Sequence, residues 1–570
     1  MKFDREQKVV VVGGVAGGMS FAARARRLSA HAEIIVFERD KYVSYANCGL
    51  PYFVSGEITQ KSSLLLQTPR SLRESLNLDV RVSTEVTEID PEARRVKVRD
   101  LKSDESYWES YDKLVLATGA LPHLPEIEGI DDPAVKTLRS VPDAEALRKI
   151  VRGEADSAIV VGAGFIGVEL AEALTTAGIR VDLVELADQV LAGFDPEMAS
   201  DVADELVANG VSLHLGCSLE RIVRDGEELC AHLSDKSVLR AHFVNLNIGV
   251  VPESTLAKTM GLKLNARGAI VVDADFRTSD PHIFAIGDLA AVQNRDTGLY
   301  GSIPLAGPAN RQGRALADLL FKNTSKKLSF SGTAIVKVFG TTAAITGFSE
   351  KSALRVGVPF QKVYLHPGNH AGYYPGAEKM HIKLIFAPDS GRVLGAQIVG
   401  GEGVDKRIDV LATAIQFGST VEELADLELA YAPQFGSAKD PVNVAGMIAS
   451  NLREGLVEYF YPEDFVDFEE ETFVVDVRTR EEFSKHHLDQ AINIPHTELI
   501  GRLAEIPKDR PVRLYCASGF RSYLAYRALR ERGVTDLATL SGGISTLQNH
   551  HATKGLLVEP VGEIFTTRAG

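Results

Sequence analysis

Two of the four cysteines lie in short polar turns and not in apolar runs. Cys48 stands in "SYANCGLPY", between Asn47 and Gly49, and Cys516 begins the loop "CASGFRS". A thiolate, not a thiol, attacks sulfur, so a reactive cysteine needs positive potential or hydrogen-bond donors that lower its pKa. We therefore expect both cysteines to take part in sulfur chemistry.

The loop that follows Cys516 is rich in small residues and precedes a predicted helix. Gly519, Arg521 and Ser522 lie within this turn, whose backbone N–H groups can curl around the sulfur. Arg521 and the amino end of the helix add positive potential. The pattern predicts a cradle that stabilises a thiolate or a persulfide anion on Cys516.

The first glycine-rich turn follows a short apolar run and precedes a helical pattern. Gly13, Val15 and Gly18 occupy the three positions of G-x-G-x-x-G, so the motif is imperfect at its second position. Such a turn brings backbone N–H groups close to a pyrophosphate at the amino end of a helix. Glu38 lies 20 residues past Gly18, where a carboxylate can accept hydrogen bonds from a ribose diol. This spacing predicts a dinucleotide site.

The second glycine-rich turn is a complete motif, formed by Gly162, Gly164 and Gly167 between an apolar run and a helical pattern. Glu185 ends the next predicted strand, 18 residues after Gly167. A carboxylate there accepts a hydrogen bond from an adenosine ribose 2′-hydroxyl and repels a 2′-phosphate. No arginine follows in "LADQV" to receive that phosphate. We therefore expect NADH in preference to NADPH.

Repeated units of strand, turn and helix must position these residues. Residues 8–40 and 157–188 share the order strand, glycine turn, helix, strand and acid, which predicts two Rossmann-like units. Two more predicted strands end at polar residues: one runs into Thr118 and Gly119, and another ends at Asp288, where we expect a helix to follow. Taken alone, Asp288 is better interpreted as an N-cap of that helix.

The pattern changes in the carboxyl-terminal half. From about Ser329, alternating strands followed by helices predict an α+β domain. The aromatic and acidic stretch "NLREGLVEYFYPEDF" is interpreted as a linker, and a new α/β unit begins with "FVVDVRTREEF".

Length and composition restrict the class of protein. At roughly 100–200 residues a domain, 570 residues predict three or four domains, and 45% hydrophobic with 24% charged residues indicates a globular protein. A net charge of -15 argues against a general nucleic-acid partner. Four scattered cysteines form no disulfide or zinc pattern, and we expect Cys217 and Cys230 to be reduced and structural. With no apolar run of about 18 residues and no signal-peptide layout, we expect a cytoplasmic protein without a membrane segment.

Residues 8–450 resemble the two-dinucleotide flavoprotein disulfide reductases. The resemblance lies in the two nucleotide units, the "ATG" and "GD" strand ends and the trailing α+β domain. In that family the first unit holds FAD, the second holds NAD(P)H, and the last domain makes a homodimer. The resemblance implies FAD contacts at Gly13, Gly18, Glu38, Thr118, Gly119 and Asp288. It implies nicotinamide-cofactor contacts at Gly162, Gly164, Gly167 and Glu185, and an acid near the stacked rings at Glu169.

Most members of the family carry two cysteines as C-x-x-x-x-C, but "CGLPYF" contains no second cysteine. An internal disulfide cannot form there, so the sulfur of Cys48 must cycle with another thiol, a persulfide sulfur or a peroxide oxygen. The stretch "SYANCGLPY" resembles coenzyme A-disulfide reductases, in which the single cysteine forms a mixed disulfide with CoA.

That resemblance also implies a CoA site. The implied contacts are Ser20, Arg24, Arg27, Ser44, Asn47 and Lys439, and Asn310 falls where some members have histidine. Arg24 and Arg27 are three positions apart and share a helical face, whereas Arg26 points elsewhere. Without the resemblance, that face could equally be an ordinary solvated one.

The hydroxyls of three tyrosines, Tyr373, Tyr374 and Tyr431, could donate a proton to a leaving CoA thiolate. The resemblance implies that Tyr431 and one of Tyr373 and Tyr374 reach the partner subunit's Cys48. From the residues alone, these tyrosines are interpreted as core or interface aromatics.

Residues 470–555 resemble rhodanese domains. The matching segments are "VVDVRTREEF", "HLDQAINIP", the C-x-x-G-x-R-S loop and "LSGGI". The resemblance implies sulfane-sulfur transfer at Cys516, with Asp476, Arg478 and Glu481 bracing the loop.

We therefore predict an α/β protein with two Rossmann-like domains, an α+β dimerisation domain and a rhodanese domain. The expected segments are 1–150 and 271–328 for FAD, 151–270 for NAD, 329–450 for dimerisation, 451–469 for a linker and 470–570 for the rhodanese domain. The expected activity is NADH-dependent reduction of CoA persulfide and CoA disulfide through Cys48 and FAD. Two alternatives stay open: an NADH oxidase or peroxidase that uses a sulfenic acid at Cys48, and a non-catalytic sulfur carrier or redox sensor.

Overall fold

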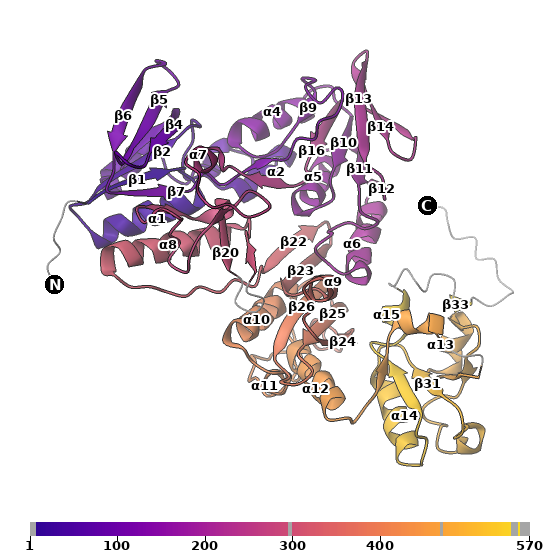
Figure 1. Ribbon diagram of the computed structural model, residues 1–570. Coiled ribbons are helices and arrows are strands. Elements are labelled where there is room, and N and C mark those ends of the chain that lie inside the picture. Colours follow the sequence, from indigo (N-terminus) through magenta and orange to yellow (C-terminus); the bar gives the residue numbers. More distant parts are fainter. Residues whose placement is uncertain (1–6, 294–298, 468–470, 549–556, 559–570) are drawn as a thin grey trace. The chain divides into compact units, whose positions relative to one another are not determined.

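The computed structural model describes residues 7–293, 299–467, 471–548 and 557–558 (Figure 1). The chain divides into two units, called unit 1 and unit 2 below. Unit 1 contains residues 1–188 and 206–332, and unit 2 contains residues 189–205 and 333–570.

Unit 1 contains two five-stranded parallel sheets, one for each glycine-rich turn. The first has the order β19-β7-β1-β2-β3, with strands β1 (Lys8–Val12), β2 (Glu33–Glu38), β3 (Asp79–Val82), β7 (Lys113–Leu116) and β19 (Ile283–Ala285). The second has the order β12-β11-β10-β16-β9, with strands β9 (Val135–Lys136), β10 (Ser157–Val161), β11 (Arg180–Glu185), β12 (Ser212–Leu215) and β16 (Phe243–Leu246). Their apolar strands are buried on both faces, as parallel sheets require.

A helix follows each glycine-rich turn. Helix α1 (Ala16–Leu28) follows β1, and α5 (Phe165–Thr176) follows β10. Helix α1 also packs closely on α8 (Ala306–Lys322). The two backbones come so near each other that a Cβ added to Gly313 would lie only 2.4 Å from the carbonyl oxygen of Gly17.

Further helices and antiparallel strands make up most of the rest of unit 1. The helices are α2 (Leu50–Ser55), α3 (Pro69–Leu76), α4 (Val141–Val151) and α7 (Thr255–Thr259). The antiparallel strands are β4 (Thr84–Asp90), β5 (Arg95–Asp100) and β6 (Ser106–Ser110), then β13 (Leu219–Asp225), β14 (Glu228–Leu233) and β15 (Val238–Ala241), and the pair β8 (Ala120–Pro122) and β17 (Val250–Pro252).

In the described residues 289–293, which follow Asp288 directly, the expected helix does not form. A single 3-10 turn, η3 (Gly287–Leu289), is followed at once by strand β20 (Ala290–Gln293). This strand pairs in parallel with β18 (Ile270–Val271) and antiparallel with β21 (Tyr300–Gly301). Strand pairing within unit 1 therefore outweighs the local helical tendency of the alanines.

Unit 2 begins with an antiparallel five-stranded sheet of order β22-β23-β26-β25-β24. Its strands are β22 (Ala334–Val338), β23 (Thr341–Gly347), β24 (Gln361–Leu365), β25 (Met380–Phe386) and β26 (Val393–Gly400). Its helices are α9 (Glu350–Val356), α10 (Val404–Phe417), α11 (Val421–Ala425) and α12 (Pro441–Arg453). Residues 189–205, expected inside the NAD segment, belong to this unit and contain most of α6 (Pro196–Ala208).

The carboxyl-terminal part of unit 2 is a parallel sheet of order β27-β32-β31-β28-β30. Its strands are β27 (Tyr459–Phe460), β28 (Phe473–Asp476), β30 (Ile492–Asn493), β31 (Val512–Tyr515) and β32 (Leu537–Leu540). Its helices are α13 (Arg480–Lys485), α14 (Phe520–Arg530) and α15 (Ile544–Gln548), and β29 (His487–Leu488) pairs with β33 (Leu557–Val558).

The segment predicted to be a linker is largely structured. Residues 451–453 finish α12, β27 is an edge strand of the last sheet, and residues 462–467 form a 3-10 turn, η4. The end of the predicted linker, from residue 468, lies outside the described residues. Within the described residues, no helix combines the length and the apolar composition needed to span a bilayer.

Candidate functional site

Cys48 lies in a 3-10 turn, η1 (Asn47–Gly49), directly before α2. The backbone N–H of Ser44 donates to the carbonyl of Gly14 at 2.8 Å, which ties this turn to the first glycine-rich turn. Ser44 has a φ of 49°, a left-handed conformation that is uncommon for serine. The thiol of Cys48 is exposed. The fold therefore presents Cys48 beside the turn for which a dinucleotide site is predicted.

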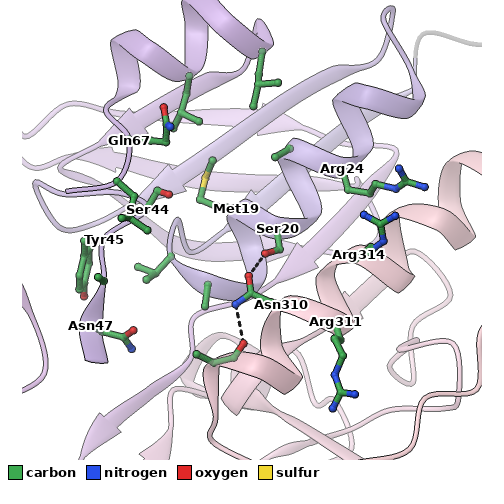
Figure 2. A pocket seen from close by; sticks show the side chains of 18 of the residues that line it. Met19, Ser20, Arg24, Ser44, Tyr45, Asn47, Gln67, Asn310, Arg311 and Arg314 are labelled. Atoms are coloured by element: carbon green, nitrogen blue, oxygen red, sulfur yellow. Dashed lines mark hydrogen bonds between the residues drawn. The ribbon is translucent and has the colours of Figure 1, made fainter. Parts of the chain in front are cut away.

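Cys48 is one of the residues that line a cavity of about 830 Å³. Figure 2 shows this cavity, with Asn47 of the same turn labelled. It is lined from three directions: by α1, by the Cys48 turn with α3, and by α8. Six of the seven predicted CoA contacts line it, and these are Ser20, Arg24, Arg27, Ser44, Asn47 and Asn310. The seventh, Lys439, is an exposed residue of unit 2.

Ion pairing fixes one of the arginines of this cavity. Arg24 donates through Nε and Nη2 to Oδ1 of Asp318, at 2.8 and 2.7 Å, and Lys326 donates to Oδ2 at 3.0 Å. Burial would raise the pKa of Asp318, but hydrogen bonds from Lys326 and Arg24 lower it. Arg24 is therefore positioned by a buried carboxylate, and much of its charge is already balanced.

Sequence reasoning missed two further arginines of the cavity. Arg311 and Arg314 both come from α8, as Figure 2 shows, and Arg311 also stacks over Phe330 at 4.8 Å. Their spacing of three on one helix was a signal available in "NRQGR". Asn310 precedes them, accepts a short hydrogen bond from Ser20 and donates to the carbonyl of Ala306 at 2.8 Å. Arg24, Arg27, Arg311 and Arg314 all line this cavity and can face a polyanion bound in it.

The protein's own groups raise the pKa of Cys48 instead of lowering it. The largest cause is the loss of hydration where neighbouring groups crowd the sulfur, although the side chain still reaches solvent. The negative charge of Glu169 is the next cause, while a backbone hydrogen bond lowers the pKa. Glu169 itself accepts a hydrogen bond from the hydroxyl of Tyr52 at 3.1 Å. Burial raises the pKa of Glu169 to about 7. The positive potential expected to lower the pKa of Cys48 is therefore not provided by Glu169 or Tyr52.

The residues predicted to contact FAD gather at the carboxyl ends of β1, β2 and β7. Gly13 has a φ of 108°, and a Cβ there would lie 2.2 Å from the carbonyl oxygen of Ala117. A Cβ on Gly18 would lie 2.0 Å from the carbonyl oxygen of Gly13. Glu38 accepts hydrogen bonds from the N–H groups of Gly14 at 2.8 Å and Asp40 at 2.9 Å. Only glycine fits the two tightest positions, and Glu38 holds the turn in shape.

Thr118, Gly119 and Asp288 continue the same edge. Thr118 donates to the carbonyl of Glu253 at 2.8 Å, and Gly119 has a φ of 71°. Burial raises the pKa of Asp288, and the charge of Arg139 opposes that shift. A half-buried carboxylate therefore lies near an arginine at this edge.

The second glycine-rich turn repeats the arrangement. Gly162 has a φ of 98°, and a Cβ on Gly167 would lie 1.8 Å from the carbonyl oxygen of Gly162. A Cβ on Gly164 would meet no atom within 4 Å, so this position opens onto free space at the start of α5. Glu185 accepts from the N–H groups of Ala163 at 2.6 Å and Ala187 at 2.9 Å.

The three tyrosines are exposed residues of unit 2. The hydroxyls of Tyr373 and Tyr431 lie 3.0 Å apart, whereas Tyr374 packs edge-on against His370. Tyr373 is therefore the one that pairs with Tyr431.

The loop at Cys516 forms part of the predicted cradle. Cys516 is buried, and the N–H of Gly519 donates to its Sγ at 3.2 Å. Gly519 has a φ of 97°, and Ser522 donates to its carbonyl at 3.1 Å. Arg521 makes a bidentate ion pair with Glu482, at 2.6 and 2.7 Å. This pair offsets the positive potential expected from Arg521.

The braces of this loop are partly those predicted. The carboxylate of Asp476 accepts from Arg478 at 2.7 to 3.0 Å, and both side chains are buried. Glu481, by contrast, is exposed, and its neighbour Glu482 is the acid that meets Arg521. The hydrogen bonds from Arg521 lower the pKa of Glu482 to about 2.

A separate acidic cluster in unit 2 resembles a cation site. Asp195, Glu197 and Glu350 bring carboxylate oxygens within 4.8 Å of one another. The ammonium group of Lys383 lies 2.8 Å from Asp195 and 2.6 Å from each glutamate. An internal cation therefore already pairs with all three carboxylates of this cluster.

The fold contains two dinucleotide-binding units of the kind found in oxidoreductases, and an exposed cysteine lies beside the first glycine-rich turn. Residues 7–313 match the family described as pyridine nucleotide-disulphide oxidoreductase, residues 333–441 match its dimerisation domain, and residues 463–550 match the rhodanese-like domain. The chain belongs to the pyridine nucleotide-disulphide oxidoreductase family, and carries a rhodanese-like domain after the dimerisation domain.

Relatives match either nearly the whole chain or about three quarters of it. Over 450 residues the chain is 34% identical to a coenzyme A disulfide reductase of Staphylococcus haemolyticus, covering 78% of this chain and all of the relative. The structure of reduced CoADR-RHD of Bacillus anthracis matches 97% of this chain and 100% of its own, with a TM-score of 0.94 and 43% identity. A NAD-dependent persulfide reductase of A. fulgidus matches 95% of this chain and 99% of its own, with a TM-score of 0.88 and 38% identity. The predicted fold class, family and flavoprotein oxidoreductase class are thus confirmed.

Proposed function

We propose that this chain is an NADH-dependent reductase of CoA disulfide and CoA persulfide. The observation that carries the proposal is that Cys48 opens into one cavity with six of the seven predicted CoA contacts. CoA carries phosphates at one end and a thiol at the other. A cavity with basic side chains on α1 and α8 and a cysteine at its margin suits a ligand of this kind.

The proposed reaction balances in sulfur and electrons. Cys48, as the thiolate, attacks the CoA-bound sulfur, so that a mixed disulfide between Cys48 and CoA forms and a thiolate leaves. The leaving group is CoA thiolate from CoA disulfide, and hydrosulfide from CoA persulfide. Two electrons from NADH then cleave the mixed disulfide, which releases CoA and restores Cys48. Glu169 lies close enough to Cys48 to act on its charge and, with a pKa of about 7, can hold or release a proton there.

The chain's residues suit both nucleotides. The tight glycines at positions 13 and 18 and the bound carboxylate of Glu38 fit an FAD adenosine and pyrophosphate, and the open space at Gly164 fits the pyrophosphate of NADH. The chemistry that FAD supplies when bound is transfer of an electron pair from NADH to a nearby sulfur. Glu185 favours NADH because its carboxylate would repel a 2′-phosphate.

The remaining assignments belong to the same proposal. The dimerisation domain supports a homodimer, in which the hydroxyl pair of Tyr373 and Tyr431 would reach the partner subunit's Cys48 and protonate the leaving thiolate. Lys439 would place a positive charge beside the CoA bound there. Cys516 would carry sulfane sulfur to or from CoA, with Gly519 donating to the sulfur. The domain boundaries and the cytoplasmic location stay predictions.

The test is NADH consumption with CoA persulfide and with CoA disulfide, in the wild type, Cys48→Ser and Cys516→Ser. We expect Cys48→Ser to lose turnover with both substrates, and Cys516→Ser to keep turnover of CoA disulfide. Full turnover in Cys48→Ser would refute the mechanism. Turnover of oxygen or peroxide without added thiol would favour an NADH oxidase or peroxidase, and slow flavin reduction without steady turnover would favour a sulfur carrier or sensor.

A further inference from the structure

A short segment of the rhodanese-like domain, residues 541–546, contacts the sulfur loop directly. The N–H of Ile544 donates to the carbonyl of Cys516 at 2.9 Å, and the N–H of Ser545 donates to the carbonyl of Ala517 at 3.1 Å. A Cβ on Gly543 would lie only 2.6 Å from the carbonyl oxygen of Cys516. The backbone at the start of α15 therefore sets where the first two residues of the loop lie.

The other side of the same segment contacts β24, in the dimerisation domain. The N–H of Tyr364 donates to Oγ of Ser541 at 3.0 Å, and Nε2 of His366 lies 2.8 Å from Oγ1 of Thr546. Ser541, Thr546 and Tyr364 are buried. A Cβ on Gly542 would lie 2.8 Å from Cβ of Tyr364, so the two backbones meet without room for a methyl group.

A second attachment joins β24 to the beginning of the last sheet. The hydroxyl of Tyr461 donates to the carbonyl of Lys362 at 2.7 Å, and the ammonium of Lys362 makes a short ion pair with Glu463. The N–H of Ser541 donates to the carbonyl of Phe460, which lies next to Tyr461. The rhodanese-like domain is thus held to β24 at two places, and not by a free tether.

Strand β24 is itself held firmly. The hydroxyl of Tyr364 donates to Glu197 at 2.8 Å, and Glu197 accepts in turn from Lys383 at 2.6 Å. All three side chains are buried, and a satisfied buried polar network restricts the positions of its members.

We propose that β24 positions the sulfur loop through residues 541–546, and that Tyr364 and His366 are positioning residues for Cys516. This rests on the sulfur-carrying role proposed above for Cys516. A displacement of residues 541–546 moves the carbonyls of Cys516 and Ala517. It thereby separates the thiol of Cys516 from the N–H of Gly519.

The test compares two isosteric changes. The double variant Ser541→Ala/Thr546→Val removes both hydroxyls that face β24. The control Thr539→Val removes a buried hydroxyl for which the described residues offer no hydrogen-bond partner, on the strand that leads into the same segment. Each is made in the full-length protein, and melting temperatures verify that both variants fold.

Two measurements then report on the loop. In a Cys48→Ser background, we expect the double variant to raise the rate of alkylation of Cys516 by iodoacetamide about tenfold, because this cysteine is only 1% exposed in the native loop. We expect its thiosulfate-to-cyanide sulfur transfer to fall on the order of 10- to 100-fold, mainly in kcat, since a small misplacement of a reacting group costs that much. The control should leave both rates unchanged.

Opposite changes in the two rates distinguish a displaced loop from general damage. Equal alkylation in the double variant and the control would overturn the proposal. If the double variant does not fold, His366→Phe removes one contact from the β24 side and should raise alkylation of Cys516 in the same direction, and no change would again overturn the proposal. If the wild type transfers no sulfur, the proposed role of Cys516 fails, whereas the alkylation rates still decide whether β24 positions the loop.

Discussion

The contact between α1 and α8 offers a sharp test of how the cavity is built. A Cβ on Gly313 would lie 2.4 Å from the carbonyl oxygen of Gly17, 2.9 Å from the backbone nitrogen of Phe21 and 3.1 Å from Cβ of Ser20. Ordinary contact begins near 3.4 Å, so the substitution Gly313→Ala needs the helices to separate by about 1 Å. Both helices line the cavity beside Cys48.

The expected loss of stability follows from this overlap. Forcing one methyl group into a close-packed contact typically costs about 1–3 kcal/mol. We therefore expect Gly313→Ala to lower the free energy of unfolding of unit 1 by that amount. The one tryptophan of the chain, Trp108 on β6, belongs to unit 1, so its fluorescence during urea unfolding reports on the correct part of the molecule.

The matched control is another glycine of the same helix. A Cβ on Gly307 would meet no atom within 4 Å, so Gly307→Ala should be neutral or slightly stabilising. We also expect Gly313→Ala to raise the KM for CoA disulfide roughly tenfold or more, because the proposed CoA contacts come from both α1 and α8. The KM for NADH should stay unchanged. Unfolding of Gly313→Ala at the urea concentration of the wild type, with an unchanged KM, would show that the contact between the helices is not as tight as described.

Four further predictions concern charged groups. Because burial raises the pKa of Glu169 to about 7, ionising it opposes folding: the free energy of unfolding should fall as the pH rises towards and through 7 in the wild type, and not in Glu169→Gln. The same variant should lower the pKa of Cys48, seen as faster alkylation at neutral pH; an unchanged alkylation profile would contradict the proposed influence of the carboxylate. Lys383→Met should destabilise unit 2 by about 3–5 kcal/mol, because it removes the cation that pairs with the buried carboxylates of Asp195 and Glu197, whereas Glu350 keeps its ion pair with Lys362. Ca²⁺ should restore part of the melting temperature, and a melting temperature equal to that of the wild type would refute this. Glu185→Gln should reduce the preference for NADH over NADPH, measured as the ratio of kcat/KM, and an unaltered ratio would remove Glu185 from cofactor selection.

Much of unit 1 could be predicted because its signals are local. A glycine-rich turn depends on backbone space that a few neighbouring residues determine, so Gly13 and Gly162 could be assigned from spacing alone, and both adopt a positive φ. The polar setting of Cys48 was likewise visible in the sequence, and it lies in the predicted turn.

Other features depend on contacts between residues far apart in the sequence. The strand that follows Asp288 forms because β18 is available for pairing, and no local pattern shows this. Glu481 was predicted to brace the loop, whereas its neighbour Glu482 is the residue that pairs with Arg521. The residue at which α13 begins decides which of the two glutamates faces Arg521. The ion pair of Arg24 with Asp318 joins residues 294 positions apart, so the loss of its free charge could not be foreseen.

The assignment of residues 189–205 to unit 2 means that the chain passes between the two units three times, after residues 188, 205 and 332. The second passage lies inside α6. A single proteolytic cut near residue 333 would therefore not release either unit, because Asp195 and Glu197 remain anchored to Lys383 on the far side of the cut. Truncation after residue 332 would remove the partners of this buried stretch and expose it, so unit 1 is not expected to be separable by simple deletion.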